Sequence, residues 1–560
     1  MNKKLFLSLI VGGAVVLTSC NKQISQFDSN YFSVNPSPLE VVGGTVPGTV
    51  TGKIPEKVFV KKAEVTVTPY LCYDGKEVAS QAYTFQGEKV RGNNQVVNYK
   101  EGGYISIPVE YAHEANMEDA TLTLAFDVKQ GKKQYTLPRV TVAKGVNTTA
   151  TIAEVATAAP AIATDKFQRI INEKYSADIK FLINQAKVRK GELNSESMKA
   201  FNEKLAFASA DSSRAIKEIN ISSYASPEGG VEYNTKLAEQ REKNTSSYLE
   251  KHLKDASISN FGELTAQFTA QDWDGFKSLV SASNIQDKDL ILSVLSMYKD
   301  PEVREKEIRN MSSVFDQLAL DILPQLRYSR LTATIDVIGK SDEQIKEAYA
   351  SNPNSLSVDE ILYCATLTND NAKKMEIYQT AANIYSNDYR TFNNLAACQF
   401  AAGDYTAAAT NLKKAAALNS SSGEVNMNLG LISMIDGDYS KANEQLGKAG
   451  GVEATNEALG VYYLLNGDNT AAAKAFGETV SNNAALAQIL CKDYSKAKRT
   501  LASITSPDAT TYYLMAILGA RTNNEGLVLS NLRQAAKLDN SLATKAQKDP
   551  EFANFNLSSL

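Results

Sequence analysis

The chain has 560 residues, with 59 Lys and Arg against 63 Asp and Glu, so its formal net charge is −4 at pH 7. This near balance, without a long basic block, argues against nucleic acid as a partner. The length predicts three or more domains. The two histidines and the scattered cysteines lack the spacing of a zinc site, so we expect no metal and no cofactor.

The first 20 residues have the pattern of an export signal. Lys3 and Lys4 precede an uncharged, largely apolar run that ends at Leu17, and this run is shorter than the ~20 residues of a membrane-spanning helix. Leu17-Thr18-Ser19-Cys20 follows, and it resembles the lipobox of bacterial lipoproteins, in which the cysteine becomes the acylated first residue. The resemblance implies a signal peptide over 1–19 and a lipid, palmitate included, on Cys20. An ordinary signal peptide with an incidental cysteine is the alternative.

The lipobox resemblance also implies a location. Several acyl chains on one residue anchor a protein stably to a membrane that it does not span. The residues after Cys20 form a polar tether to residue 30, and they lack the acidic run that resembles a surface-export tag in Bacteroidota lipoproteins. We therefore expect an outer-membrane lipoprotein of the Bacteroidota kind that faces the periplasm.

Residues 31–150 have the alternating pattern of β-strands. Turn signals such as Asp74-Gly75-Lys76 separate the short runs, which are Val58–Val60, Ala63–Tyr70, Tyr104–Val109, Ala120–Phe126 and Gln134–Leu137. Regular short strands of this kind predict an antiparallel, immunoglobulin-like sandwich that serves as a spacer or contacts a partner. Residues 151–164 are rich in Ala, Thr and Pro, and this composition predicts a linker.

Residues 165–340 alternate strand and helix patterns, which predicts an α+β domain. The predicted strands and helices are Ile179–Ile183, Asn194–Ala210, Ile216–Tyr224, Glu232–Leu253, Leu264–Thr269 and Leu331–Val337. A strongly helical insertion spans about 272–327, and its Trp273 is expected to be a packing anchor.

The second of these strands leads through Ser226-Pro227-Glu228-Gly229 into a helix. A helix start presents free backbone N–H groups, which suit a carboxylate. At these residues the chain resembles the C-terminal, peptidoglycan-associating domain of the OmpA family. The matches keep the family spacing and are Tyr224, Gly229, Asn234, Leu237, Arg241 and Tyr248-Leu249. The Ser-Pro-Glu-Gly loop with an Asp-Trp-x-Gly insertion resembles a Bacteroidota variant of that family.

In the OmpA family an aspartate takes the ammonium of a peptidoglycan stem, and the arginine holds its carboxylate. Here Ser226 stands in place of that aspartate, and Glu228 is the nearest carboxylate that replaces its charge. The resemblance therefore implies a stem-binding site of Ser226, Glu228, Asn234 and Arg241. In the alternative interpretation the loop is a plain turn and Arg241 is a structural residue of the helix.

Residues 341–560 contain a repeat. Ala401-Ala402-Gly403-Asp404-Tyr405 recurs as Ile435-Asp436-Gly437-Asp438-Tyr439, and 34 residues is the tetratricopeptide (TPR) period. Related motifs at Gly467-Asp468 and Lys492-Asp493 continue the series with trimmed spacing, and Asp508–Leu538 is predicted to be the last repeat. Residues 358–385 fit a degenerate first repeat. Stacked repeats predict an all-α solenoid whose concave groove binds a protein partner.

The motifs of common enzyme classes are missing from the sequence. Gly-x-Ser-x-Gly, His-Glu-x-x-His and P-loop patterns are all absent, so we expect a protein that is not an enzyme. The first hypothesis is an envelope tether that contacts peptidoglycan and recruits a protein. The second is a pure protein–protein scaffold, or a subunit of an envelope secretion or surface-assembly complex, without peptidoglycan binding.

Overall fold

The computed structural model describes residues 23–285, 287–558 and 560. The predicted signal peptide and Cys20 lie outside the described residues. The chain forms two compact units. The repeat unit comprises the residues up to Thr164 together with Thr368–Leu560, and the sheet unit comprises Asp165–Leu367. None of the described helices is long and apolar enough to cross a membrane.

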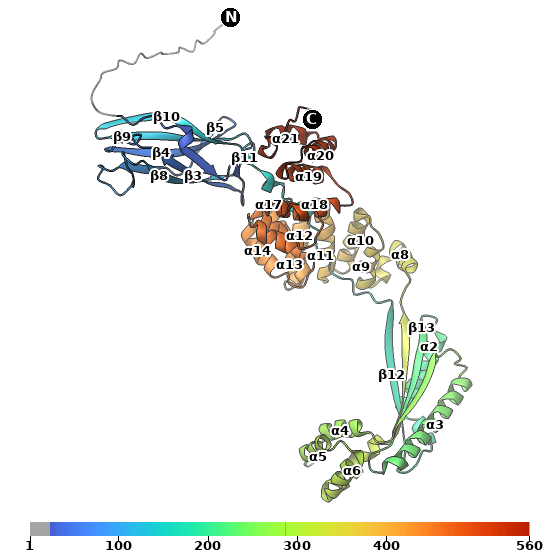
Figure 1. Ribbon diagram of the computed structural model, residues 1–560. Coiled ribbons are helices and arrows are strands. Elements are labelled where there is room, and N and C mark those ends of the chain that lie inside the picture. Colours follow the sequence, from blue (N-terminus) through green and yellow to red (C-terminus); the bar gives the residue numbers. More distant parts are fainter. Residues whose placement is uncertain (1–22, 286, 559) are drawn as a thin grey trace. The chain divides into compact units, whose positions relative to one another are not determined.

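The first part of the repeat unit consists of two packed sheets (Figure 1). Their orders are β1-β3-β8 and β10-β9-β4-β6-β7, with β5 on β4. The strands are β1 (Phe32–Asn35), β3 (Thr45–Ile54), β4 (Ala63–Tyr73), β5 (Lys76–Ala79), β6 (Tyr83–Gly87), β7 (Gln95–Val97), β8 (Gly103–Ala112), β9 (Thr121–Gln130) and β10 (Lys133–Lys144). Every second residue of β4 is buried. The alternation that predicted these strands is therefore the inward face of the sandwich.

The N-terminal region is thus β-rich, as predicted, but several details of the prediction are wrong. Val58–Val60 forms a turn region although Val58 and Phe59 are buried. The strand pair β6–β7 is parallel, as is the pair of β2 (Leu39–Glu40) with β11 (Val146–Asn147). Strand β3 was missed because it contains Gly48 and Gly52. A Cβ at Gly48 would lie 2.5 Å from Leu39 Cδ2, and one at Gly52 would lie 2.7 Å from Ile105 Cγ1, so close packing requires both glycines.

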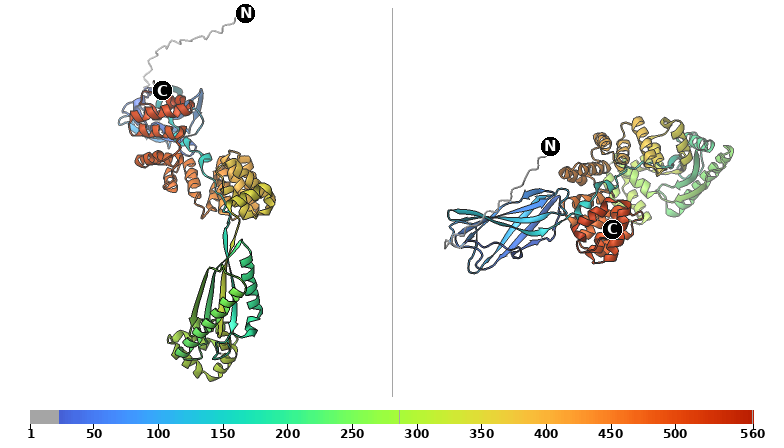
Figure 2. Two further views of the ribbon diagram at one scale, coloured as in Figure 1. Left: turned by 90° about the vertical axis from the view of Figure 1, so that its right-hand side faces the viewer. Right: turned by 90° about the horizontal axis from the view of Figure 1, so that it is seen from above.

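The sheet unit is built on a four-stranded sheet of order β12-β15-β13-β14. Helices α2 and α3 cover one of its faces (Figure 2). The bounds are β12 (Ile170–Lys180), α1 (Lys190–Leu193), α2 (Glu196–Ala210), β13 (Arg214–Tyr224), α3 (Val231–Asp255), β14 (Glu263–Thr269) and β15 (Tyr328–Ile338). The first strand was predicted too late. Leu182 and Ile183 lie in a loop with 46% and 54% exposed side chains, whereas β12 begins at Ile170 with residues too exposed to show alternation.

The helical insertion of the sheet unit packs around its own apolar core, which includes Phe276, Val280 and Ile291. Its helices are α4 (Trp273–Ala282), α5 (Lys288–Met297), α6 (Pro301–Asn310), α7 (Ser312–Asp321) and the short η4 (Leu323–Leu326). Trp273 packs against this core, with its ring 5.7 Å from that of Phe276. Helices α8 (Asp342–Ser351) and α9 (Val358–Thr366) complete the unit.

The rest of the repeat unit is a run of helices consistent with a TPR-like solenoid (Figure 1). They are α10 (Asn371–Ile384), α11 (Tyr389–Ala401), α12 (Tyr405–Leu418), α13 (Gly423–Ile435), α14 (Tyr439–Gly447), α15 (Thr455–Leu465), α16 (Asn469–Phe476), α17 (Asn482–Leu490), α18 (Tyr494–Ala502), α19 (Ala509–Arg521), α20 (Glu525–Leu538) and α21 (Ser541–Lys548). From α11 to α20 they pair in order. The expected degenerate repeat at 358–385 is divided, because the boundary between the units falls between α9 and α10.

The recurring Gly-Asp motif explains the helix pairing. Gly403 and Gly437 follow a first helix with φ of +80° and +76°, a conformation that glycine adopts without strain. The next residue, Asp404 or Asp438, caps the second helix by accepting a hydrogen bond from a backbone N–H three residues on. Each motif therefore ends one helix and starts its partner.

Candidate functional site

The first helices of successive pairs carry buried asparagines. Asn393 and Asn394 on α11, Asn428 on α13 and Asn483 on α17 are at most 2% exposed. A buried amide costs free energy unless its N–H groups and its oxygen find partners. Their partners therefore reveal what the face formed by these helices, here called the first-helix face, is built to hold.

The asparagines bind the backbone of the chain's own residues 151–164, here called the groove segment. Asn394 Oδ1 accepts from Ala163 N–H at 2.8 Å, and Asn394 Nδ2 donates to the Ala163 carbonyl at 2.9 Å. Asn428 makes the same pair of bonds to Ala161 at 2.7 and 2.8 Å, and Asn393 donates to the same carbonyl at 3.1 Å. The amides of Asn394 and Asn428 thus each pair with one residue's N–H and carbonyl, as the backbone of an adjacent β-strand would.

The same recognition continues on other first helices. Asn483 pairs with the N–H and carbonyl of Glu154 at 3.0 and 2.8 Å. Glu457 on α15 accepts from Ala159 N–H, and burial raises the pKa of this carboxyl. Arg390 on α11 donates to the Thr164 carbonyl at 3.3 Å. The segment therefore crosses α17, α15, α13 and α11 in turn, against the sequence order of the repeats.

Side-chain size completes the fit. Ala161 and Ala163 are 4% and 1% exposed, and Ala161 joins the apolar core of the helices, whereas Ile162 between them is 46% exposed. Ala158 is also buried in that core. Over residues 161–163 the first-helix face thus encloses two small side chains and leaves the side chain between them in solvent.

A buried carboxylate holds the chain just before this segment. Glu551 Oε1 accepts from Asn147 Nδ2 at 2.8 Å and from Thr149 Oγ1 at 2.7 Å. Arg521 at the end of α19 donates to both oxygens of Glu551 at 2.6 to 3.1 Å. The pKa of Glu551 lies below its ordinary value, because the hydrogen bonds and charge of Arg521 outweigh burial. This cluster ties the β-rich region to the last repeat.

These contacts change the interpretation of two expectations. Residues 151–164 connect the β-rich region with the α+β region in the sequence, and they pack against the helices of the repeat unit. The face expected to hold a protein partner holds this segment. The repeat motifs of the sequence did not predict this role of Asn394 and Asn428. The missing signal is the recurrence of Asn at similar positions of the first helices.

In the sheet unit, the four predicted stem-binding residues lie close to one another. Asn234 is 3% exposed, and its Nδ2 donates to the carbonyls of Ser226 at 2.9 Å and Gly229 at 2.8 Å. Ser226 Oγ donates to Glu228 Oε1 at 2.9 Å. Asn234 therefore fastens the loop to the start of α3, and the serine hydroxyl is engaged by the neighbouring carboxylate.

Glu228 has a partner that the sequence analysis did not identify. Arg327, just after η4, donates to Glu228 through Nε at 3.1 Å and Nη2 at 2.9 Å. Both side chains are largely buried, at 11% and 18% exposure. Since 99 residues separate the two positions, the pairing is a product of the fold that no local motif predicts.

Arg241 is enclosed. It is 1% exposed, and its guanidinium donates to the carbonyls of Gln185 at 3.0 Å, Tyr224 at 2.7 Å and Leu182 at 3.3 Å. Burial and the nearby charge of Arg327 lower its pKa to about 10. The family resemblance assigns the guanidinium of Arg241 to a ligand carboxylate. In the structure it joins the loop after β12 to the end of β13.

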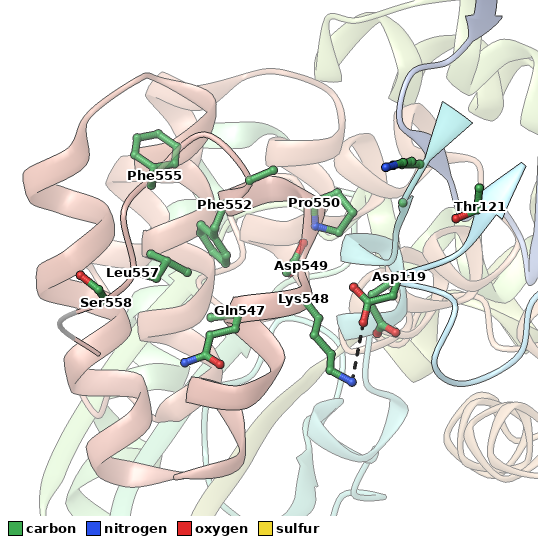
Figure 3. A pocket seen from close by; sticks show the side chains of 15 residues that line it. Asp119, Thr121, Gln547, Lys548, Asp549, Pro550, Phe552, Phe555, Leu557 and Ser558 are labelled. Carbon is green, nitrogen blue, oxygen red and sulfur yellow. Dashed lines mark ion pairs between the residues drawn. The ribbon is translucent and has the colours of Figure 1, made fainter. Parts of the chain in front are cut away.

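An open pocket of about 560 Å³ lies in the repeat unit, between the β-rich region and the C-terminal residues (Figure 3). Asp119 and Lys548 in its wall already pair at 3.7 Å. We interpret the pocket as the junction of the two parts. Among residues 23–285 and 287–558, no group of three or more His, Cys, Asp or Glu is placed to hold a metal ion.

No protein-family model and no curated protein matches the chain. Solved structures do match. A tetratricopeptide repeat protein from Parabacteroides merdae is 13% identical over 37% of this chain and 90% of that chain, with a TM-score of 0.29. PilF of Pseudomonas aeruginosa is 16% identical over 37% and 99%, with a TM-score of 0.29. Yeast Tom70 is 13% identical over 56% and 72%, with a TM-score of 0.25. Likenesses this distant carry no argument, and the repeat arrangement is seen in the paired helices α11 to α20 themselves.

Proposed function

We propose that the chain is a non-enzymatic scaffold protein of the bacterial envelope, anchored through a lipid on Cys20 and facing the periplasm. The observation that carries the scaffold role is the first-helix face. Its buried asparagines on three first helices, together with Glu457 on a fourth, bind the backbone of the groove segment. Such a surface serves protein recognition and has no catalytic arrangement of side chains.

The sheet unit supports the envelope part of the proposal. Its four strands, its two helices on one face and the spacing from Tyr224 to Arg241 are those expected of an OmpA-like domain with an inserted helical region. Peptidoglycan contact through Ser226, Glu228, Asn234 and Arg241 is the second candidate function, and the gapless motif favours it. The engaged guanidinium of Arg241 favours a scaffold without that contact, because a ligand carboxylate would have to displace backbone carbonyls.

Sedimentation with purified peptidoglycan sacculi separates these two candidates. We expect the soluble form, residues 21–560, to remain in the supernatant, since Arg241 and Glu228 already have partners within the fold. Co-sedimentation that Glu228→Ala abolishes would establish peptidoglycan contact and overturn the scaffold-only form of the proposal. Lys236→Ala is the matched control, because Lys236 lies on α3 with a side chain 74% exposed.

Metabolic labelling tests the anchor. We expect the full chain, expressed in a bacterium that acylates lipoproteins, to incorporate labelled palmitate and to fractionate with the outer membrane. Cys20→Ser is expected to lose the label, because the thiol is the acylation site in a lipobox. Cys72→Ser is the control and should keep the label, since Cys72 is a partly buried residue next to the β-sandwich core. Equal labelling of Cys20→Ser and the parent chain would refute the anchor.

A further inference from the structure

We propose that the groove segment is an intramolecular ligand, and that the first-helix face is a receptor for extended segments of the pattern small–any–small, as in Ala161-Ile162-Ala163. The inference rests on the proposed scaffold role in treating this face as a binding surface. It goes beyond that role by naming the ligand class and by identifying the occupant as the chain itself.

The recognition is directed at the backbone. Asn394, Asn428 and Asn483 each bind both the N–H and the carbonyl of a single residue. These groups are common to all residues except proline, so the amides select an extended conformation and not a side chain. An isolated peptide of the right shape can satisfy them as well as the chain's own segment does.

Side-chain selection comes from packing. Ala158, Ala161 and Ala163 are at most 4% exposed, and Ala158 and Ala161 belong to the apolar core of the helices. A larger side chain at these two positions would require the helices to move apart. Ile162 is 46% exposed, so its position tolerates other residues. The ligand class is therefore a short extended stretch that has Ala-sized residues at two positions separated by one exposed residue.

The covalent connection explains why such a ligand stays in place. The strand pair β11–β2 and the contacts of Glu551 fix the chain at residues 146–149, immediately before the segment. A tethered segment has an effective concentration in the millimolar range, and a free peptide at micromolar concentration competes poorly with it. The intact chain thus keeps its receptor closed until a stronger ligand displaces the segment.

Peptide binding tests the proposal. In the test variant, residues 153–164 are replaced by a Gly/Ser stretch of equal length, and the probe is a fluorescent synthetic peptide of residues 151–164. We expect saturable binding to the variant and binding at least about tenfold weaker to the intact chain, because the tethered segment competes. Circular dichroism first establishes that the variant is folded. If it is not, Ala161→Lys with Ala163→Lys in the full chain opens the same face with the segment retained.

Matched changes identify the register. A peptide with Ala161→Lys is expected to lose binding, whereas one with Ile162→Lys is expected to retain it, because only the first side chain is enclosed. Adding Asn428→Ala to the opened protein should weaken peptide binding by roughly 10- to 100-fold, since two hydrogen bonds to Ala161 are lost.

Two outcomes would overturn the proposal that this face is a receptor. One is a folded, opened protein that does not bind the native peptide, and the other is equal binding of the Ala161→Lys peptide. The sacculus and anchor experiments are independent of either result.

Discussion

Arg241→Ala is expected to destabilise the sheet unit by about 3–5 kcal/mol of unfolding free energy. The substitution removes the donors of the carbonyls of Leu182, Tyr224 and Gln185. A buried carbonyl left without a donor costs about 1–3 kcal/mol, and the vacated volume adds to this loss. Arg241→Lys is expected to recover only part of the stability, because one ammonium cannot replace a planar fork that serves three acceptors.

Trp273 provides the measurement for this prediction. It is the only tryptophan in the chain, and it packs in the helical insertion of the same unit. Its fluorescence during denaturant unfolding therefore reports on the sheet unit. Lys236→Ala on the same helix should leave the transition unchanged, since that side chain is 74% exposed. If Arg241→Ala unfolds at the same denaturant concentration as the parent chain, the carbonyls find other donors without the guanidinium. The guanidinium of the parent chain would then be available to a ligand.

Glu551→Ala is expected to release residues 147–149 and to destabilise the repeat unit by about 3–5 kcal/mol. Glu551 is 6% exposed, and its partner Arg521 is 13% exposed. Removing one member of a buried pair leaves the other charge uncompensated, which accounts for a loss of that size. Far-UV circular dichroism measures the stability, and amide hydrogen exchange over residues 147–164 shows whether the chain detaches there.

The effect of Glu551 is expected to depend on pH. Its pKa in the folded protein lies below the ordinary 4.5. A carboxyl with a lowered folded pKa contributes stability that is complete above its unfolded pKa and is lost as pH falls through the folded pKa. The stability difference between the parent chain and Glu551→Gln should therefore be constant near neutrality and shrink below about pH 4.5. Asp549 contributes in the opposite direction, because burial raises its pKa and the charge of Glu551 adds to that rise.

A difference that stays constant down to strongly acidic pH would contradict the ion pair. Glu525→Gln offers the control, because Glu525 is an exposed residue at the start of α20. Its stability profile should follow that of the parent chain at every pH. Thr149→Val is a second, smaller change, since it removes one hydrogen bond to Glu551 and keeps the charge pair.

Local patterns predicted much of the secondary structure. Alternation along β4, β8 and β9 identified the sandwich because each of these strands has one face in the core and one in solvent. It failed at β3, where glycines replace side chains for close packing, and at β12, whose first half is exposed on both faces. The Gly-Asp motif predicted the helix pairs, because its glycine ends one helix and its aspartate caps the next.

By itself, then, the sequence determined the order of β-rich, α+β and helical regions and the residues of the loop before α3, since these depend on contacts between near neighbours. Only the tertiary structure decided the partners of the functional candidates. Glu228 pairs with Arg327, Arg241 donates to three backbone carbonyls, and Asn394 and Asn428 bind the segment that composition predicted to be a linker. In each of these contacts a buried polar group forms a hydrogen bond to a group that is distant in the sequence. Such a pairing has no fixed sequence spacing, so the partner cannot be read from the sequence.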